Sequence, residues 1–313
     1  MQLTTQHLST HDTHAMDPFS SDGELVNIHT AFTQAQYSSV ITDYSTSDFS
    51  SSNHLPVQIL QYRAQCALGQ YDEVIGSISD ADAQRTPDLA AVRVYASYLQ
   101  KPSEGAVTEA QRLAEKKGDN LTVQLLASTV LAREGKYEDA LALLSKHQGS
   151  LDAVALIVQI HLLQNRTDLA LKEAASARSF AQDALLVNLA ESWIGMRQGG
   201  EQYQKAFYVF EELAQAPSSQ SATSLIAQSV AELHLGRTEE GETALGSALG
   251  LDQGNTTGLA DKVVLDAVTG RDIRESRGKL EAVDKGHELL LDLAAKREAF
   301  REAAGKYNPK FES

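Results

Sequence analysis

A short string of residues recurs along this chain at a nearly constant interval, and this repetition restricts the fold more than any other feature. Each copy begins with a small or turn-forming residue, has an aromatic or turn-forming residue two positions later, and ends in a small residue followed by an aliphatic one. Clear copies occupy 35–41, 69–75 and 135–141, and looser ones lie around 165–171, 203–207 and 236–241. The small residues near the end of each copy, here called the anchors, are Val40, Val74, Ala110, Ala140, Ala170, Ala206 and Gly241.

The anchors lie on average about 34 residues apart, which is the length of the tetratricopeptide repeat (TPR), a helix–turn–helix unit. The two antiparallel helices of such a unit, A and B, bury their apolar faces only against neighbouring units. The first residue of the string would end helix A with a left-handed backbone, and the anchor would let helix B approach helix A closely. The sequence therefore predicts an all-α, TPR-like α-solenoid of about seven units.

The string fades beyond Leu251, where three further helices are expected over 256–269, 274–283 and 284–304. A last helix with polar flanks is what a solenoid needs to cover its final apolar face. We therefore expect a disordered tail over 1–20, a solenoid with its C-terminal capping helices over 21–304, and a short tail over 305–313.

The sixth unit departs from the pattern, because about four residues are added between its helices around Gly199 and Gly200. The added glycines predict a longer turn at this point. The same unit holds the largest aromatic concentration of the chain, Trp193, Tyr203, Phe207, Tyr208 and Phe210. Their helical spacing favours the core, with exposure of part of the set to a partner as the alternative, since Trp and Tyr are favoured at interfaces.

The balance of charge argues against two classes of partner. Asp and Glu number 42 against 27 Lys and Arg, a formal net charge of −15, and no basic run exceeds Lys116-Lys117. Nucleic acid and anionic lipid are therefore poor direct partners. Acidic pairs at 72–73, 138–139, 211–212 and 239–240 are expected at the starts of B helices, where they complement the helix dipole.

Motifs for catalysis are incomplete. Gly236 and Gly241 have the glycine spacing of a P-loop, but Glu242 stands where a lysine must neutralise phosphate, so close helix packing is favoured. His287-Glu288 begins a zinc-protease pattern that lacks its second histidine. We expect neither enzymatic activity nor a cofactor, although the fold alone does not exclude catalysis.

Other residues with reactive or metal-binding side chains have simpler interpretations. Cys66, the single cysteine, lies in an expected A helix and is interpreted as a packing residue that suits a reducing cytosol. His7, His11 and His14 have a metal-like spacing, but their neighbours form helices poorly, so a flexible tail is favoured. The Asn-x-Thr sequences at 120, 165 and 255 are interpreted as helix starts and turns, because no export signal or membrane span is visible.

Several segments resemble a known family more specifically than generic TPR content. They are 27–32 with 37–41, 87–99, 158–173 and 199–213, of which the last, with its Gly-Gly-Glu insertion and aromatic helix, is the most specific. Over about residues 17–312 the chain resembles the epsilon subunit of coatomer, the coat of COPI vesicles.

The resemblance implies a non-catalytic structural subunit of a heptameric coat. Such a solenoid closes around part of the C-terminal domain of the alpha coatomer subunit, and the coat supports Golgi-to-ER retrograde and intra-Golgi transport. The implied location is the cytoplasm, peripherally on Golgi membranes and COPI vesicles, with membrane contact made indirectly through the coat. The family's interface is not a short motif, so the resemblance does not identify individual interface residues in this chain.

TPR geometry independently selects candidates for a partner groove, on the inner faces of A helices at the second, fifth and ninth positions. The candidates are Ile59, Arg63, Val92, Tyr95, Leu99, Leu125, Thr129, Asp152, Ala155 and Gln159. For each apolar member, the core between repeats is the alternative. A second possible function is a TPR adaptor or co-chaperone that binds a peptide carboxylate in the groove. Such binding needs Lys or Arg side chains at regular positions along the groove. The A helices offer Arg63 and Arg93 but no regular set of this kind.

Overall fold

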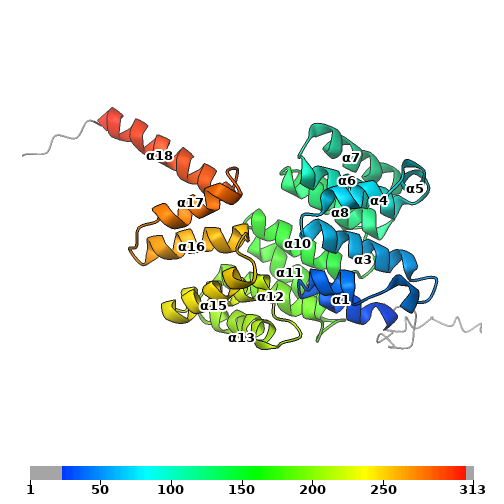
Figure 1. Cartoon of the computed structure of the whole chain (residues 1–313), viewed down its shortest axis with the longest axis horizontal. Coiled ribbons are helices and arrows are strands. Elements are labelled where there is room, and N and C mark those ends of the chain that lie inside the picture. Colours follow the sequence, from blue (N-terminus) through cyan, green and yellow to red (C-terminus); the bar gives the residue numbers. More distant parts are fainter. Residues whose placement is uncertain (1–22, 308–313) are drawn as a thin grey trace, which may run out of the picture. The chain divides into compact units, whose positions relative to one another are not determined.

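The computed structural model describes residues 23–307, and within that range all regular secondary structure is helical (Figure 1). The expected all-α fold is thus confirmed, whereas the tail expected over 1–20 and the histidines at 7, 11 and 14 lie outside the described residues. The chain divides into two compact units, unit 1 up to Gln202 and unit 2 from Tyr203. Among the described residues, no helix has both the length and the apolar composition needed to cross a membrane.

Unit 1 consists of successive helix pairs in which each A helix is followed by its B helix. The pairs are α1 (Val26–Thr33) with α2 (Tyr37–Thr42), α3 (His54–Ala67) with α4 (Tyr71–Ser77), α6 (Pro87–Gln100) with α7 (Glu104–Lys117), α8 (Leu121–Arg133) with α9 (Tyr137–Leu144), and α10 (Leu151–Leu163) with α11 (Thr167–Arg178). The A helix α12 (Leu185–Gln198) follows. Short helices η1 (Gly23–Leu25), η2 (Thr46–Asp48) and α5 (Asp80–Arg85) lie before or between the pairs.

Unit 2 holds most of α13 (Glu201–Gln215), then the pair α14 (Ala222–His234) and α15 (Thr238–Leu251), the pair α16 (Thr256–Val268) and α17 (Arg274–Val283), and the last helix α18 (Glu288–Tyr307). The helices expected over 256–269 and 274–283 are confirmed. The last helix begins later than expected and continues past 304. Leu290 packs with Leu280 and Leu259 over the end of the unit, while Phe300 and Tyr307 are exposed.

The turn between the helices of a pair follows from the first residue of the string. Gly69, Gly135 and Gly236 have φ of 78°, 71° and 79°, and Ala35 and Asn165 adopt the same left-handed region at 60° and 58°. In each case the next backbone N–H reaches back to the carbonyl five residues earlier, at 2.8–3.0 Å, which satisfies a carbonyl at the end of helix A. The same arrangement recurs between α16 and α17, where the sequence string had faded.

Where both helices of a pair belong to one unit, the anchor lies where helix B meets helix A. Val40, Val74, Ala110, Ala140 and Ala170 are completely buried, and Ala206 is 1% exposed. A Cβ on Gly241 would lie 3.0 Å from the side chain of Leu233 and 3.2 Å from the carbonyl oxygen of Ser229. The Ser229 hydroxyl donates a hydrogen bond of 2.6 Å to the carbonyl of Gly241, so the P-loop-like glycine spacing serves close helix packing.

Two expectations about the sixth unit and its acids are wrong. Only Gly199 and Gly200 separate α12 from α13, against three residues at 68–70, so the turn is shorter rather than longer. Both glycines have positive φ, a backbone that glycine adopts readily, and the added residues extend the start of α13 instead. The acidic pair 211–212 consequently lies near the end of α13, whereas 72–73, 138–139 and 239–240 do occupy first turns.

The Asn-x-Thr sequences serve local structure, as expected. Asn120 and Asn255 are N-cap residues whose side chains accept hydrogen bonds from the backbone of Val123 and Gly258. Asn165 occupies the left-handed turn after α10.

Candidate functional site

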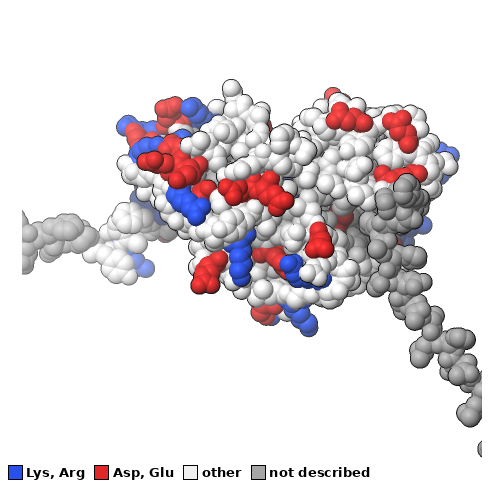
Figure 2. All heavy atoms as spheres, turned by 90° about the horizontal axis from the view of Figure 1, so that it is seen from below, with Lys and Arg blue, Asp and Glu red and all other residues white. Residues whose placement is uncertain are grey.

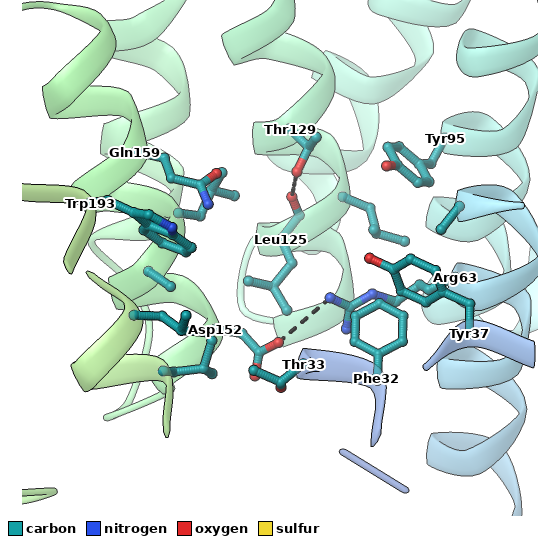
Figure 3. A pocket seen from close by; sticks show the side chains of 16 residues that line it. Phe32, Thr33, Tyr37, Arg63, Tyr95, Leu125, Thr129, Asp152, Gln159 and Trp193 are labelled. Carbon is teal, nitrogen blue, oxygen red and sulfur yellow. Dashed lines mark hydrogen bonds and ion pairs between the residues drawn. The ribbon is translucent and has the colours of Figure 1, made fainter. Parts of the chain in front are cut away.

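A pocket of about 290 Å³ lies on the inner side of unit 1, where its A helices face one another (Figure 3). Helices α1, α3, α6, α8, α10 and α12 contribute to it, together with the first residue of α2. The lining residues are Phe32, Thr33, Tyr37, Arg63, Ala67, Tyr95, Leu125, Leu126, Thr129, Asp152, Ala155, Leu156, Gln159, Leu186, Leu189 and Trp193.

The first A helix of the solenoid, α1, contacts the fifth and sixth, α10 and α12, so that residues of all three helices line the same open pocket. Nε2 of His29 on α1 donates a hydrogen bond of 2.8 Å to Oδ2 of Asp152 on α10, across 123 residues of chain. Helix α1 also contacts α12. Small rotations between successive repeats accumulate in a solenoid, so helices remote in sequence meet after several units.

An ion pair joins Arg63 of α3 to Asp152 of α10, and the two side chains point toward one another in the pocket (Figure 3). The guanidinium of Arg63 lies 3.5 Å from Oδ1 of Asp152 and 4.5 Å from the ring centroid of Phe32. Burial alone would raise the pKa of Asp152, but the hydrogen bond from His29 and the charge of Arg63 outweigh burial and lower that pKa to about 2. Asp152 is therefore ionised at neutral pH and compensates the charge of Arg63.

The remaining polar groups of the lining leave little charge for a ligand. The Thr129 hydroxyl donates to the carbonyl of Leu125 on its own helix at 2.8 Å. Burial raises the pKa of Tyr37 and Tyr95, so both phenols are neutral at physiological pH. The pocket offers apolar and aromatic surface beside its polar groups, and a protein segment with apolar side chains would bury the apolar part.

The structure brings seven of the ten predicted groove residues together in this pocket, namely Arg63, Tyr95, Leu125, Thr129, Asp152, Ala155 and Gln159. Ile59 and Val92 lie instead in the core between the second and third units, at 5% and 0% exposure, and Leu99 packs partly buried against the same core. The consensus positions assume that the groove is lined by the same positions along every A helix. The pocket meets α3 near its C-terminal end and α10 from its first turns onward, so the facing positions differ between units.

Several lining residues escaped the sequence reasoning although a signal existed. Leu186, Leu189 and Trp193 repeat the three- and four-residue spacing of Asp152, Ala155 and Gln159, but the residues added to the sixth unit shift them relative to the anchor. His29 does not line the pocket but contacts Asp152, which does. It stands eleven residues before Val40, as Arg63 stands eleven before Val74, so the consensus applied to the first unit would have found it.

The aromatic concentration of the sixth unit is divided between core and surface. Trp193 packs against the core of α10–α12 and also lines the pocket. Phe207 and Phe210 are 4% exposed, whereas Tyr208 is 59% exposed. Tyr203 stacks on His234 with ring centroids 4.7 Å apart.

Within 23–307 there is no group of three or more His, Cys, Asp or Glu side chains arranged to hold a metal ion. Cys66 is 2% exposed, and its burial raises the pKa of the thiol to about 11, which agrees with a packing residue.

Solved structures confirm the class of fold. The chain is similar to the structure of the APC/C hetero-tetramer Cut9–Hcn1, with a TM-score of 0.56 and 14% identity over 86% of this chain and 52% of that one. It is equally similar to a tetratricopeptide repeat protein from Parabacteroides merdae, with a TM-score of 0.56 and 10% identity over 83% and 97% of the two chains. The protein is thus a TPR-like α-solenoid with a pocket on the inner faces of its A helices.

The sequence comparisons are more specific. A family model described as the coatomer epsilon subunit matches residues 21–308. Coatomer subunit epsilon-1 of Arabidopsis thaliana is 30% identical over 92% of this chain and 98% of its own length. The probable coatomer subunit epsilon of Schizosaccharomyces pombe is 32% identical over 74% and 75% of the two chains. The chain belongs to the coatomer epsilon subunit family, which gives it a structural role in the COPI vesicle coat.

Proposed function

We propose that this protein holds the C-terminal domain of the alpha coatomer subunit and that the pocket of unit 1 receives a segment of that domain. The observation that carries the proposal is the convergence of A helices from α1 to α12 on one pocket, in a chain that belongs to a coat-subunit family. The work of such a subunit is assembly rather than chemistry.

The lining indicates what kind of segment fits. Among the described residues that line the pocket, Arg63 is the one cation, and Asp152 compensates its charge. Leu125, Leu156 and Trp193 offer apolar surface in the same pocket. An uncharged segment with apolar or aromatic side chains would bury that surface without leaving an unpaired charge.

The alternative function, a groove that binds a peptide carboxylate, has less support. Arg63 is engaged by Asp152, and Arg93 forms an ion pair with Asp80. A carboxylate entering the pocket would also meet the ionised Asp152. Titration with an acidic C-terminal peptide should give no saturable binding at concentrations where the alpha subunit's C-terminal region binds.

Membership in the coat also suggests where in the cell the protein acts and in which transport steps. We infer a role in Golgi-to-ER retrograde and intra-Golgi transport, in the cytoplasm and peripherally on Golgi membranes and COPI vesicles. Other subunits of the heptameric coat would make the membrane contact. In support, the coloured surface in Figure 2 shows acidic side chains in several groups interspersed with Lys and Arg, with no continuous basic face in that view.

A matched pair of substitutions tests the proposal. Ala155→Arg places a long cation in the pocket, and Leu171→Arg places the same side chain on α11, where Leu171 is 42% exposed outside the lining. We expect Ala155→Arg to weaken binding of the alpha subunit's C-terminal region at least tenfold, because its long side chain occupies the pocket and adds a second cation beside Arg63. Leu171→Arg should bind as the unsubstituted protein does.

The measurement is calorimetric titration with that region, accompanied by circular dichroism to verify folding and by a pull-down from cytosol. Equal binding by both variants would remove the pocket from the interface. Recovery of the unsubstituted chain only as a free monomer would contradict the proposed function itself.

A further inference from the structure

Helix α1 is attached to the two sides of the pocket by different kinds of contact. On its own side, Ile28 is completely buried in an apolar cluster with Val40 of α2 and Val57 of α3. All the described members of that cluster lie between residues 25 and 64. Across the pocket, α1 is joined to α10 by the polar contact between His29 and Asp152, and it also contacts α12, which contributes no described residue to that apolar cluster.

These two attachments differ in what their loss would expose. Separating α1 from α2 and α3 would bring fully buried aliphatic side chains into water, which is strongly unfavourable. Separating His29 from Asp152 would not leave the carboxylate alone, because Arg63 remains 3.5 Å away. The His29 side chain is already 36% exposed and would regain hydrogen bonds from water. The contacts of α1 across the pocket, with α10 and α12, are therefore the ones that can open while α1 stays anchored to α2 and α3.

The size of the pocket gives a reason for opening. A volume of about 290 Å³ is at the lower end of what accommodates a small molecule, and it is too small for a folded segment of chain. Phe32 and Thr33, both on α1, form part of the wall. A movement of α1 away from α10 would widen the pocket on that side.

We propose that α1 is a clasp, closed by His29 and Asp152, that releases α10 to admit a partner segment into the pocket and closes again around it. The inference rests on the proposed function for the identity of that partner, the alpha subunit. The clasp itself is a property of the free chain. It can therefore be measured both with and without the partner.

The first test uses hydrogen exchange of the full chain alone. In His29→Ala, the amides of Val26–Thr33 should exchange at least threefold faster than in the unsubstituted protein, with α6–α9 unchanged. The matched control is Asp168→Asn, which removes an exposed acid paired with Arg166 on α11, away from the pocket. This control should leave exchange in α1 unaltered. Equal exchange of α1 in His29→Ala and in the unsubstituted protein would overturn the clasp.

The second test closes the clasp covalently. The double variant His29→Cys with Asp152→Cys is joined by a bismaleimide spacer, and the same protein capped with a monofunctional maleimide is its control. Cys66 is buried in α3 and is kept. Joining should slow association with the purified C-terminal region of the alpha subunit at least tenfold relative to the capped protein.

The outcomes separate the two proposals. Equal association rates for the joined and capped proteins would overturn the clasp while leaving the proposed function intact. Absence of binding by the unsubstituted protein would instead reject the proposed function, and the exchange experiment would still decide whether α1 opens.

Discussion

At the scale of single residues, the left-handed position that ends each A helix shows how local chemistry sets the repeat. Glycine fills it at Gly69, Gly135 and Gly236, while Ala35 and Asn165 accept the same backbone with a side chain present. An L-residue with a Cβ is disfavoured in this region by about 1–2 kcal/mol, and asparagine tolerates it better than alanine. Among these turn residues, Ala35 is therefore the one whose replacement by glycine should increase the stability of the protein most.

Ala35→Gly should raise the free energy of unfolding by about 0.5–1 kcal/mol, because relief of the left-handed strain exceeds the added freedom of the unfolded chain. Gly135→Ala should lower it by about 1 kcal/mol, since a Cβ there meets no atom within 4 Å and only the backbone is affected. Urea unfolding of both variants measures the changes. Destabilisation by Ala35→Gly would contradict the prediction.

Asp152 makes stability depend on pH in a definite direction. Its folded pKa of about 2 lies below the ordinary 3.8, so the stabilisation it provides is present above about pH 4 and is lost as pH falls toward 2. From that shift it amounts to about 2 kcal/mol. In urea unfolding, Asp152→Asn should therefore be destabilised near neutral pH, and its difference from the unsubstituted protein should shrink below pH 4.

Asp168 provides the control for this dependence. Its pKa is also lowered to about 2, first by the hydrogen bond from Arg166, but its side chain is 62% exposed and water screens the interaction. Asp168→Asn should change stability little at any pH. A pH dependence as large as that of Asp152→Asn would show that burial in the pocket is not the cause.

At the scale of the helix, contact between neighbouring helices decides which small residues are required. Two of the three glycines of helix α15, Gly241 and Gly246, have contrasting surroundings. A Cβ on Gly241 would lie within 3.0–3.2 Å of Leu233 and Ser229, whereas a Cβ on Gly246 would meet nothing within 4 Å. The same chemical change therefore has opposite consequences one and a half turns apart.

Gly241→Ala should destabilise the protein by about 1–3 kcal/mol, because α14 must move away from α15 and the hydrogen bond from Ser229 must lengthen. Gly246→Ala should stabilise it by about 0.5–1 kcal/mol, since alanine replaces glycine in a helix interior at an open position. Thermal unfolding compares the two variants under identical conditions. Equal shifts in the same direction would contradict the packing argument.

At the scale of the whole molecule, the solenoid is held by contacts between neighbouring repeats and divides into two compact units. Leu131 belongs to the core between α8 and α10 in unit 1, and Leu245 to the core of α14–α16 in unit 2. Both are almost completely buried, at 2% and 1% exposure. Each truncation should therefore act mainly on its own unit.

Leu131→Ala and Leu245→Ala should each cost about 2–4 kcal/mol, through lost burial and the cavity left behind. Hydrogen exchange should accelerate in α8–α10 for the first variant and in α14–α16 for the second. The other unit should keep its protection in each case. Acceleration spread evenly over both units would show that the chain unfolds as one cooperative body.

Much of the fold could be predicted because it rests on chemistry local in sequence. The left-handed turns, the buried anchors and the helices over 256–268 and 274–283 all follow from residues within one repeat. The sixth unit was harder, because a two-glycine turn and an earlier helix start place the same residues differently. The pair α16–α17 also shows that the turn persists after its sequence string has faded.

The candidate site could be predicted only in part, for a related reason. A consensus identifies inner-face positions such as Arg63 and Asp152, but it treats every repeat alike. It therefore also selected Ile59 and Val92, which lie in the core, and passed over Phe32 and Trp193, which line the pocket. Which residues along each A helix line the pocket depends on the rotation accumulated over the repeats before that helix.

The sequence by itself thus determined the repeat, its all-helical character, its turns and its likeness to a family of coat subunits, since these depend on short-range spacing and residue type. Only the tertiary structure decided that α1 returns to α10 and that His29 meets Asp152 across 123 residues. That meeting depends on curvature summed over several repeats, and no single repeat encodes the sum.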